Sequence, residues 1–180
     1  MRNKSVIWIT TTAVFVALLV GIQVITAPFG QFITGSLVNL ILIIAVMTRG
    51  FTSGLTVAFI SPVFAKLLGV GPLWTIIPFI MAGNIALILV WHLTGKMKFA
   101  NKHVVHIVSL VTAAVCKFII LFAGIVKVAV PLLMNLPEPQ SAVISTMFSF
   151  PQLITALIGG ALATAILPVL EKIRVSGPDK

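Results

Sequence analysis

Residues 113–130 read AAVCKFIILFAGIVKVAV, and this apolar stretch decides the fold class. Its apolar residues are continuous and do not alternate with polar ones, which indicates a helix and not a strand of a membrane β-barrel. The stretch belongs to a longer apolar run over residues 103–134, and about 20 apolar residues suffice for a helix to cross a bilayer. Lys117 and Lys127 are its only charged residues. It therefore predicts a membrane-spanning helix that carries two ammonium groups.

The rest of the chain has the same composition. Apolar residues make up 59% of its 180 residues and charged residues 8%, and the mean hydropathy is +1.21. A soluble domain of this size needs more polar surface. Further apolar runs cover residues 6–27, 32–47, 51–68, 73–93 and 141–170. We therefore predict an all-α integral membrane protein of about six transmembrane helices in one bundle, with residues 1–180 forming a single transmembrane domain. Prolines are expected to interrupt several helices, at Pro62, Pro78, Pro131 and Pro151.

The basic residues fall on one side of this predicted bundle. With six spans, nine of the twelve lysines and arginines lie in the termini and in the loops after the second and fourth helices. These nine are Arg2, Lys4, Arg49, Lys96, Lys98, Lys102, Lys172, Arg174 and Lys180. Cytoplasmic loops carry such an excess, so we expect a cell-membrane protein with both termini in the cytoplasm and no nucleic-acid partner. A cleaved signal peptide is the alternative for the first run, which is longer than the usual 7–15 apolar residues.

The scarcity of acidic residues excludes several functions. The three in the chain, Glu138, Glu171 and Asp179, lie outside the predicted spans. Ion-coupled transporters and intramembrane proteases usually need carboxylates or histidine pairs at membrane depth. The chain also has no glycine-rich phosphate loop with a lysine for ATP hydrolysis. A lone cysteine, Cys116, and three histidines without ligand spacing predict no metal site. We expect no enzyme activity and no cofactor.

Lys117 and Lys127 have no carboxylate partner in any predicted span. An unpaired ammonium at mid-bilayer is costly, so each lysine snorkels to an interface, is held by a polar partner, or faces a cavity for an anionic solute. Lys117 lies about 20 Å of helix rise from the start of its run, which makes snorkelling difficult. Lys127 lies nearer the outer end, where snorkelling is easier.

Other polar residues are expected at membrane depth, either as helix–helix hydrogen bonds or as ligands. They are Gln23, Asn39, Asn84, Ser149, Gln152 and Thr155. The proline-interrupted segments FSFPQL and IIPFIMAGN favour a cavity, because broken helices are tolerated where they line one. On the first helix, Ala13, Ala17 and Gly21 are spaced four apart, which lets another helix approach closely. That helix can belong to this chain or to a partner.

Six helices in under 200 residues, cytoplasmic termini, no ATPase motif and the sequence AVFVA together resemble the substrate-binding S components of energy-coupling factor (ECF) transporters. The resemblance covers essentially the whole chain in architecture, and its one motif, Ala-x-x-x-Ala, is common in membrane helices. It implies a subunit that binds a water-soluble vitamin in an outward-facing pocket. It also implies association with a transmembrane coupling subunit and two ATPase subunits, with the stripe of Ala13, Ala17 and Gly21 docking on the coupling subunit.

The resemblance further implies a pocket built from the fourth to sixth helices, with residues 29–32 as a lid. In this sequence the substrate-binding residues would be Asn84, Lys117, Lys127, Ser149 and Gln152. Two lysines without membrane carboxylates favour an anionic vitamin. Pantothenate is the first candidate, and niacin and biotin are the others. A self-sufficient channel or facilitator for small solutes, and a membrane assembly subunit that transports nothing, are the alternative functions.

Overall fold

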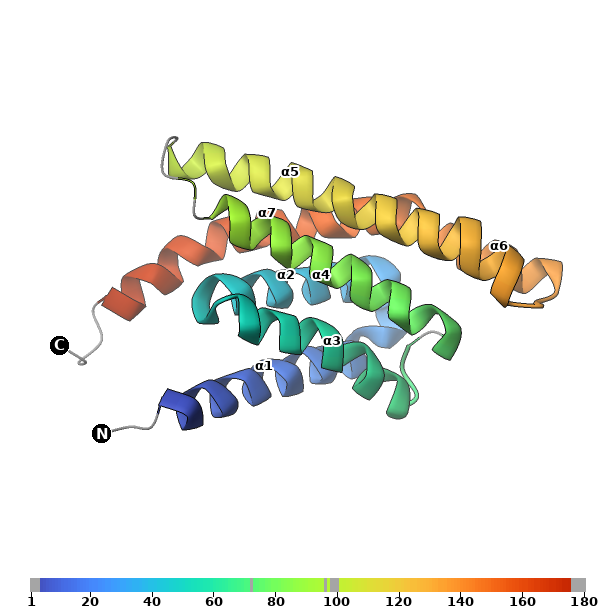
Figure 1. Cartoon of the computed structure of the whole chain (residues 1–180), viewed down its shortest axis with the longest axis horizontal. Helices are drawn as coiled ribbons and strands as arrows, with labels where there is room; N and C mark the ends of the chain where they lie inside the picture. The colour runs from blue at the N-terminus through green and yellow to red at the C-terminus, as the bar shows by residue number, and fades with distance from the viewer. Residues whose placement is uncertain (1–3, 72, 96, 98–100, 176–180) are drawn as a thin grey trace.

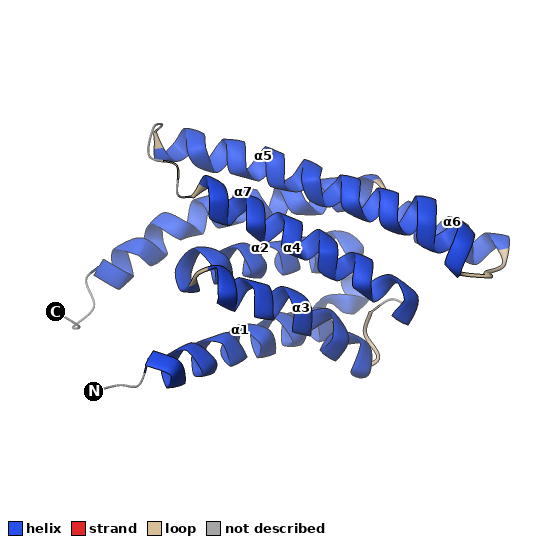
Figure 2. Cartoon of the chain, viewed as in Figure 1, coloured by secondary structure: helices blue, strands red, loops and turns tan. Residues whose placement is uncertain are grey.

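The computed structural model describes residues 4–71, 73–95, 97 and 101–175, and this part of the chain is helical without any strand (Figures 1 and 2). Its elements are α1 (Lys4–Thr26), η1 (Ala27–Phe29), α2 (Gln31–Arg49), α3 (Phe51–Leu67), η2 (Trp74–Ile76), α4 (Ile77–Thr94), α5 (Lys102–Leu121), η3 (Phe122–Leu133), α6 (Glu138–Met147) and α7 (Phe150–Val175). The predicted all-α fold is confirmed.

Five apolar helical segments in the described part are long enough to cross a membrane. They cover Lys4–Phe29, Gln31–Arg49, Trp74–Thr94, Val104–Leu133 and Glu138–Leu170. The sixth predicted span, α3, has 17 residues and rises about 25 Å, which is close to the ~30 Å of a hydrocarbon core. The predicted runs and the observed helices differ by a few residues at most of their ends.

The predicted interruptions at Pro131 and Pro151 have opposite outcomes in the structure. The helix does not break at Pro131: α5 continues through this residue as the π-helical segment η3 and ends at Leu133. The break near Pro151 is real and divides the predicted last span into α6 and α7. Since proline fits the first turn of a helix, where its missing N–H is not needed, Pro151 lies just inside the start of α7.

Helix α2 is the centre of the bundle and contacts α1, α3, α4 and α7. Residues 38–43 of α2 are all buried, whereas α1 exposes large apolar side chains such as Val6, Ile9 and Ile25, as expected of a surface that faces lipid. A Cβ added to Gly159 of α7 would lie 2.6 Å from the Cβ of Asn39 and from the backbone oxygen of Ser36. The bare glycine therefore lets α7 pack directly on α2.

The first turn of α1 and the last turn of α7 lie at the same end of the bundle (Figure 1). The end of α2 lies there too, where Gly50 alone connects it to α3 with φ +87° and ψ 174°, a conformation open almost only to glycine. The connections α1–α2 and α3–α4, together with α6, lie at the opposite end (Figure 1), which we call the loop end. The chain runs from one end of the bundle to the other an even number of times, so the start of α1 and the end of α7 lie at the same end.

Candidate functional site

A partly open cavity of about 480 Å³ lies at the loop end of the bundle. Its walls come from the end of α1, the first half of α2, the end of α3, the α3–α4 connection, α4, α5, α6 and the first turn of α7. Most lining side chains are apolar, among them Val38, Ile76, Ile80 and Leu121. None of the described residues that line the cavity is acidic. The cavity therefore offers an apolar wall with a few polar groups, which is typical of a small-molecule site.

Lys117 is the central polar residue of this cavity. Its Nζ donates hydrogen bonds to Asn39 Oδ1 at 2.6 Å and to Asn84 Oδ1 at 2.7 Å, which joins α5 to α2 and α4. Lys117 is 4% exposed and each asparagine is 1% exposed. The ammonium therefore does not snorkel. It is held by neutral amides, and its charge has no counter-ion in the described part of the cavity.

Several polar groups of the cavity have unused hydrogen-bonding capacity. An ammonium has three N–H donors, and Lys117 uses two of them on the asparagine oxygens. Asn39 Nδ2 is buried without an acceptor among the described residues, and Gln23 Oε1 is buried without a donor there. Both residues line the cavity. A buried polar group left unpaired costs about 1–3 kcal/mol, so these atoms are where a ligand gains most.

Gln152 also lines the cavity, whereas Ser149 does not. The buried Gln152 side chain donates from Nε2 to the backbone oxygen of Met147 at 3.1 Å and so closes the end of α6. The half-buried Ser149 donates from Oγ to the backbone oxygen of Ser145 at 2.6 Å, within its own turn. Of the five predicted substrate-binding residues, the structure thus brings Asn84, Lys117 and Gln152 together in one cavity.

The structure corrects the predicted placement of Lys127. Its side chain is exposed, outside the cavity, with Nζ 5.5 Å from the centre of the Phe122 ring. Ten residues along an α-helix already rotate a side chain about 80° from its starting face. The π-helical turns of η3, which begin at Phe122, change the rotation per residue and shift this register further. Lys127 is therefore free to snorkel, as its exposed place in η3 allows.

Sequence reasoning missed several lining residues, among them Gln23, Asn39 and Lys66. Asn39 and Gln23 were noted as polar residues at membrane depth without a role in the pocket, and Lys66 was counted only as a charge near a span end. All three line the cavity, Lys66 with a half-buried side chain. The position of Asn39 could have marked it as a cavity residue, because this polar side chain lies well inside an apolar run. In the predicted lid, Gly30 and Gln31 border the cavity, whereas Phe29 and Phe32 lie exposed outside it.

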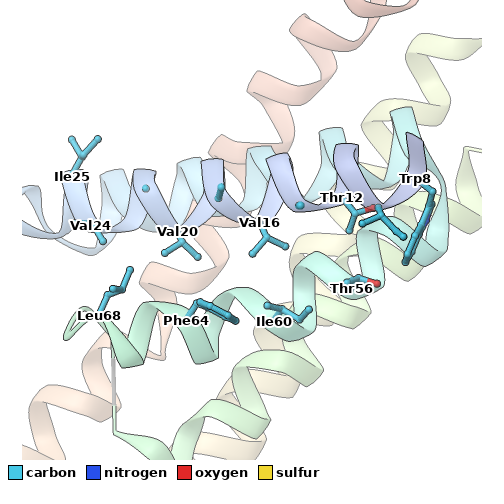
Figure 3. A pocket seen from close by; sticks show the side chains of 14 residues that line it. Trp8, Thr12, Val16, Val20, Val24, Ile25, Thr56, Ile60, Phe64 and Leu68 are labelled. Atoms are coloured by element: carbon cyan, nitrogen blue, oxygen red, sulfur yellow. The ribbon is translucent and has the colours of Figure 1, made fainter. Parts of the chain in front are cut away.

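A second hollow is an open apolar groove of about 720 Å³ between α1 and α3 (Figure 3). Val16 and Val20 of α1 point across it toward Ile60 and Phe64 of α3 (Figure 3). The predicted docking residues Ala13, Ala17 and Gly21 all line this groove. A Cβ added to Gly21 would meet nothing within 4 Å. The small-residue stripe is therefore not packed against another described helix and faces the surroundings of the chain.

Comparisons of the chain with protein-family models, with curated proteins and with solved structures return no match.

Proposed function

We propose that the chain is the substrate-binding membrane subunit of an ECF-type importer for a water-soluble vitamin or related micronutrient that carries a negative charge. The observation that carries the proposal is the Lys117 ammonium, which lines the loop-end cavity and is held only by the amide oxygens of Asn39 and Asn84. A bound anion supplies the counter-ion that the described part of the cavity does not contain. Pantothenate is the first candidate, with niacin and biotin as the others.

The closed inner half of the bundle supports binding over conduction. Between the cavity and the end of the bundle that holds the first turn of α1 and the last turn of α7, the bundle is filled by a packed core that includes the fully buried Leu42, Ile88 and Trp91. A facilitator that works alone needs a path through this layer. The second candidate function, a small-solute facilitator, therefore requires a larger rearrangement of the bundle than a binding subunit does.

The open groove supports a partner in the membrane. Its lining is almost wholly apolar, and its small residues leave the backbone of α1 accessible, which is what close helix packing in lipid requires. We propose that a transmembrane coupling subunit docks there and is driven by two ATPase subunits, because this chain has no phosphate-binding motif. With both termini in the cytoplasm, as the positive charges favour, the loop-end cavity faces the outside.

The proposal is tested with the detergent-purified chain. Mass spectrometry of co-purified small molecules identifies a bound anion, and titration calorimetry with pantothenate, biotin and nicotinate measures binding directly. Reconstituted alone in vesicles, the chain should bind its substrate but not accumulate or equilibrate it. Rapid equilibration of the solute by the chain alone contradicts the proposal and favours the facilitator. A chain that binds none of the three acids contradicts the proposed substrate class.

A further inference from the structure

The buried oxygen of Gln23 indicates a second requirement on the substrate. Gln23 lies near the end of α1, and its half-buried side chain lines the loop-end cavity. Its Oε1 atom is buried and receives no hydrogen bond from the described residues. An amide oxygen is an acceptor only, so the group that satisfies it must be an O–H or N–H donor.

The unpaired groups of the cavity are sorted by depth. Asn39 lies eight residues after the start of α2, about 12 Å of helix rise from its loop end. Gln23 lies three residues before the end of α1, about 4.5 Å from that end. The ammonium of Lys117 bonds to Asn39 and so shares its depth. Of the two buried unpaired atoms that belong to lining residues, the donor Asn39 Nδ2 therefore lies deep in the cavity, beside Lys117, and the acceptor Gln23 Oε1 lies nearer the loops.

We infer that the substrate is a carboxylate that also bears a hydroxyl or N–H group, with the carboxylate at Lys117 and Asn39 and the donor at Gln23. The inference rests on the proposed function and narrows its substrate class. The deep end offers the third N–H of Lys117 and the free Nδ2 of Asn39, both of which suit a carboxylate. Apolar side chains such as Val38 and Ile80 line the same cavity and suit a hydrocarbon body between the two polar groups.

This requirement separates the candidate acids. Pantothenate has two hydroxyls and an amide N–H, and biotin has two ureido N–H groups. Ionised nicotinate has a carboxylate and a ring nitrogen, which are acceptors only. Nicotinate can therefore satisfy Lys117 but leaves the Gln23 oxygen unpaired. A site that is built to hydrogen-bond a substrate donor rejects an analogue without one, because its own buried group then loses its partner.

Titration calorimetry on the purified chain tests this with pantothenate, biotin and nicotinate as probes. The better of pantothenate and biotin should bind the unmodified chain at least about 5-fold more tightly than nicotinate, as expected for one unpaired buried group. Gln23→Met keeps the side-chain length and removes the acceptor. It should weaken that acid by about 5- to 100-fold and leave nicotinate within about 3-fold. Gln140→Met is the control, because Gln140 of α6 is an exposed glutamine that does not line the cavity, and it should change none of the three affinities.

Each outcome decides the inference. An equal loss for all three acids with Gln23→Met shows a general disturbance of the cavity and overturns it, as does no loss for any of them. If Gln23→Met does not fold, the comparison of the three acids on the unmodified chain still decides, because tighter binding of nicotinate overturns the inference alone. If no acid binds the unmodified chain, the proposed function fails first and the inference fails with it.

Discussion

Replacing Lys117 with methionine is the sharpest test of the anionic-substrate proposal. Methionine keeps most of the length and volume of the lysine stem and removes the ammonium. In the structure this deletes the donor to Asn39 Oδ1 and to Asn84 Oδ1, and the third N–H of a residue that lines the cavity. The binding free energy and the stability of the bundle therefore change for different reasons and can be measured separately.

The expected loss of affinity follows from the third donor. A hydrogen bond to a charged group is worth about 1.5–3 kcal/mol net, which corresponds to about a 10- to 150-fold increase in Kd. Stability changes in two directions. Two buried asparagine oxygens lose their donor at about 1–3 kcal/mol each, whereas removing an ammonium from a membrane helix gains about 2.5–3.5 kcal/mol. These terms nearly offset, so we expect the folded bundle to survive.

The assay compares two proteins with two ligands by titration calorimetry. The ligands are the acid that binds most tightly among pantothenate, biotin and nicotinate, and the primary amide of that acid. The amide should bind the unmodified chain about 10- to 150-fold more weakly than the acid and should lose less than about 3-fold on Lys117→Met. Lys127→Met is the matched control, because Lys127 is a lysine of the same continuous helix that lies exposed outside the cavity. It should change neither affinity.

Two results refute the reasoning. If the Lys117→Met protein binds the acid as tightly as the unmodified chain, the ammonium is only a structural link between α2, α4 and α5. If the acid and its amide weaken equally, the substitution has disturbed the shape of the cavity and the charge has no direct role. A thermal melt of each variant in detergent shows that the folded protein is being compared.

Three further predictions concern the groove, the packing and the topology. The double substitution Ala13→Trp and Ala17→Trp should abolish accumulation of the substrate in whole cells, because the groove admits no further volume once a helix has docked. The Kd of the substrate for the isolated chain should stay within about 3-fold, and an equal loss of binding contradicts docking. Gly159→Ala should lower stability in detergent by about 1–3 kcal/mol, as overpacking does, whereas Gly21→Ala should change it by less than about 0.5 kcal/mol; equal melting temperatures contradict the close α2–α7 contact. Reporter fusions after Arg49 and after the last residue should report the cytoplasm, and a fusion within residues 135–140 the outside; an external C-terminus refutes the assigned orientation.

The helices were predictable because lipid removes most alternatives. Every spanning segment must satisfy its own backbone, so continuous apolar runs of about 20 residues translate directly into helices. The division of the last run at Pro151 followed from the missing N–H of proline. The π-helical continuation through Pro131 did not, because no residue pattern in Phe122–Leu133 distinguishes it from an ordinary apolar helix. That local change of winding adds to the rotation that already turns Lys127 away from the face of Lys117 in an ordinary α-helix.

The cavity was only half predictable for a related reason. The cost of burying an ammonium identified Lys117 from the sequence, and the same cost requires polar partners at its depth. Which partners they are depends on how α2 rotates and packs in the centre of the bundle, which apolar periodicity cannot give for a helix buried on nearly all sides. Asn39 was therefore not distinguished from a residue that bonds two helices.

The geometry of α1 predicts that the proposed substrate binding and the proposed docking can be separated by mutation. Gly21 lines the groove and Gln23 lines the cavity, although they are two residues apart. Two residues along an α-helix rotate a side chain by about 200°, so the two point to nearly opposite faces of α1. A larger side chain at Ala13, Ala17 or Gly21 extends into the groove and away from the cavity. One helix thus separates the proposed substrate cavity from the proposed docking surface, and a partner that packs in the groove would contact the helix that carries Gln23.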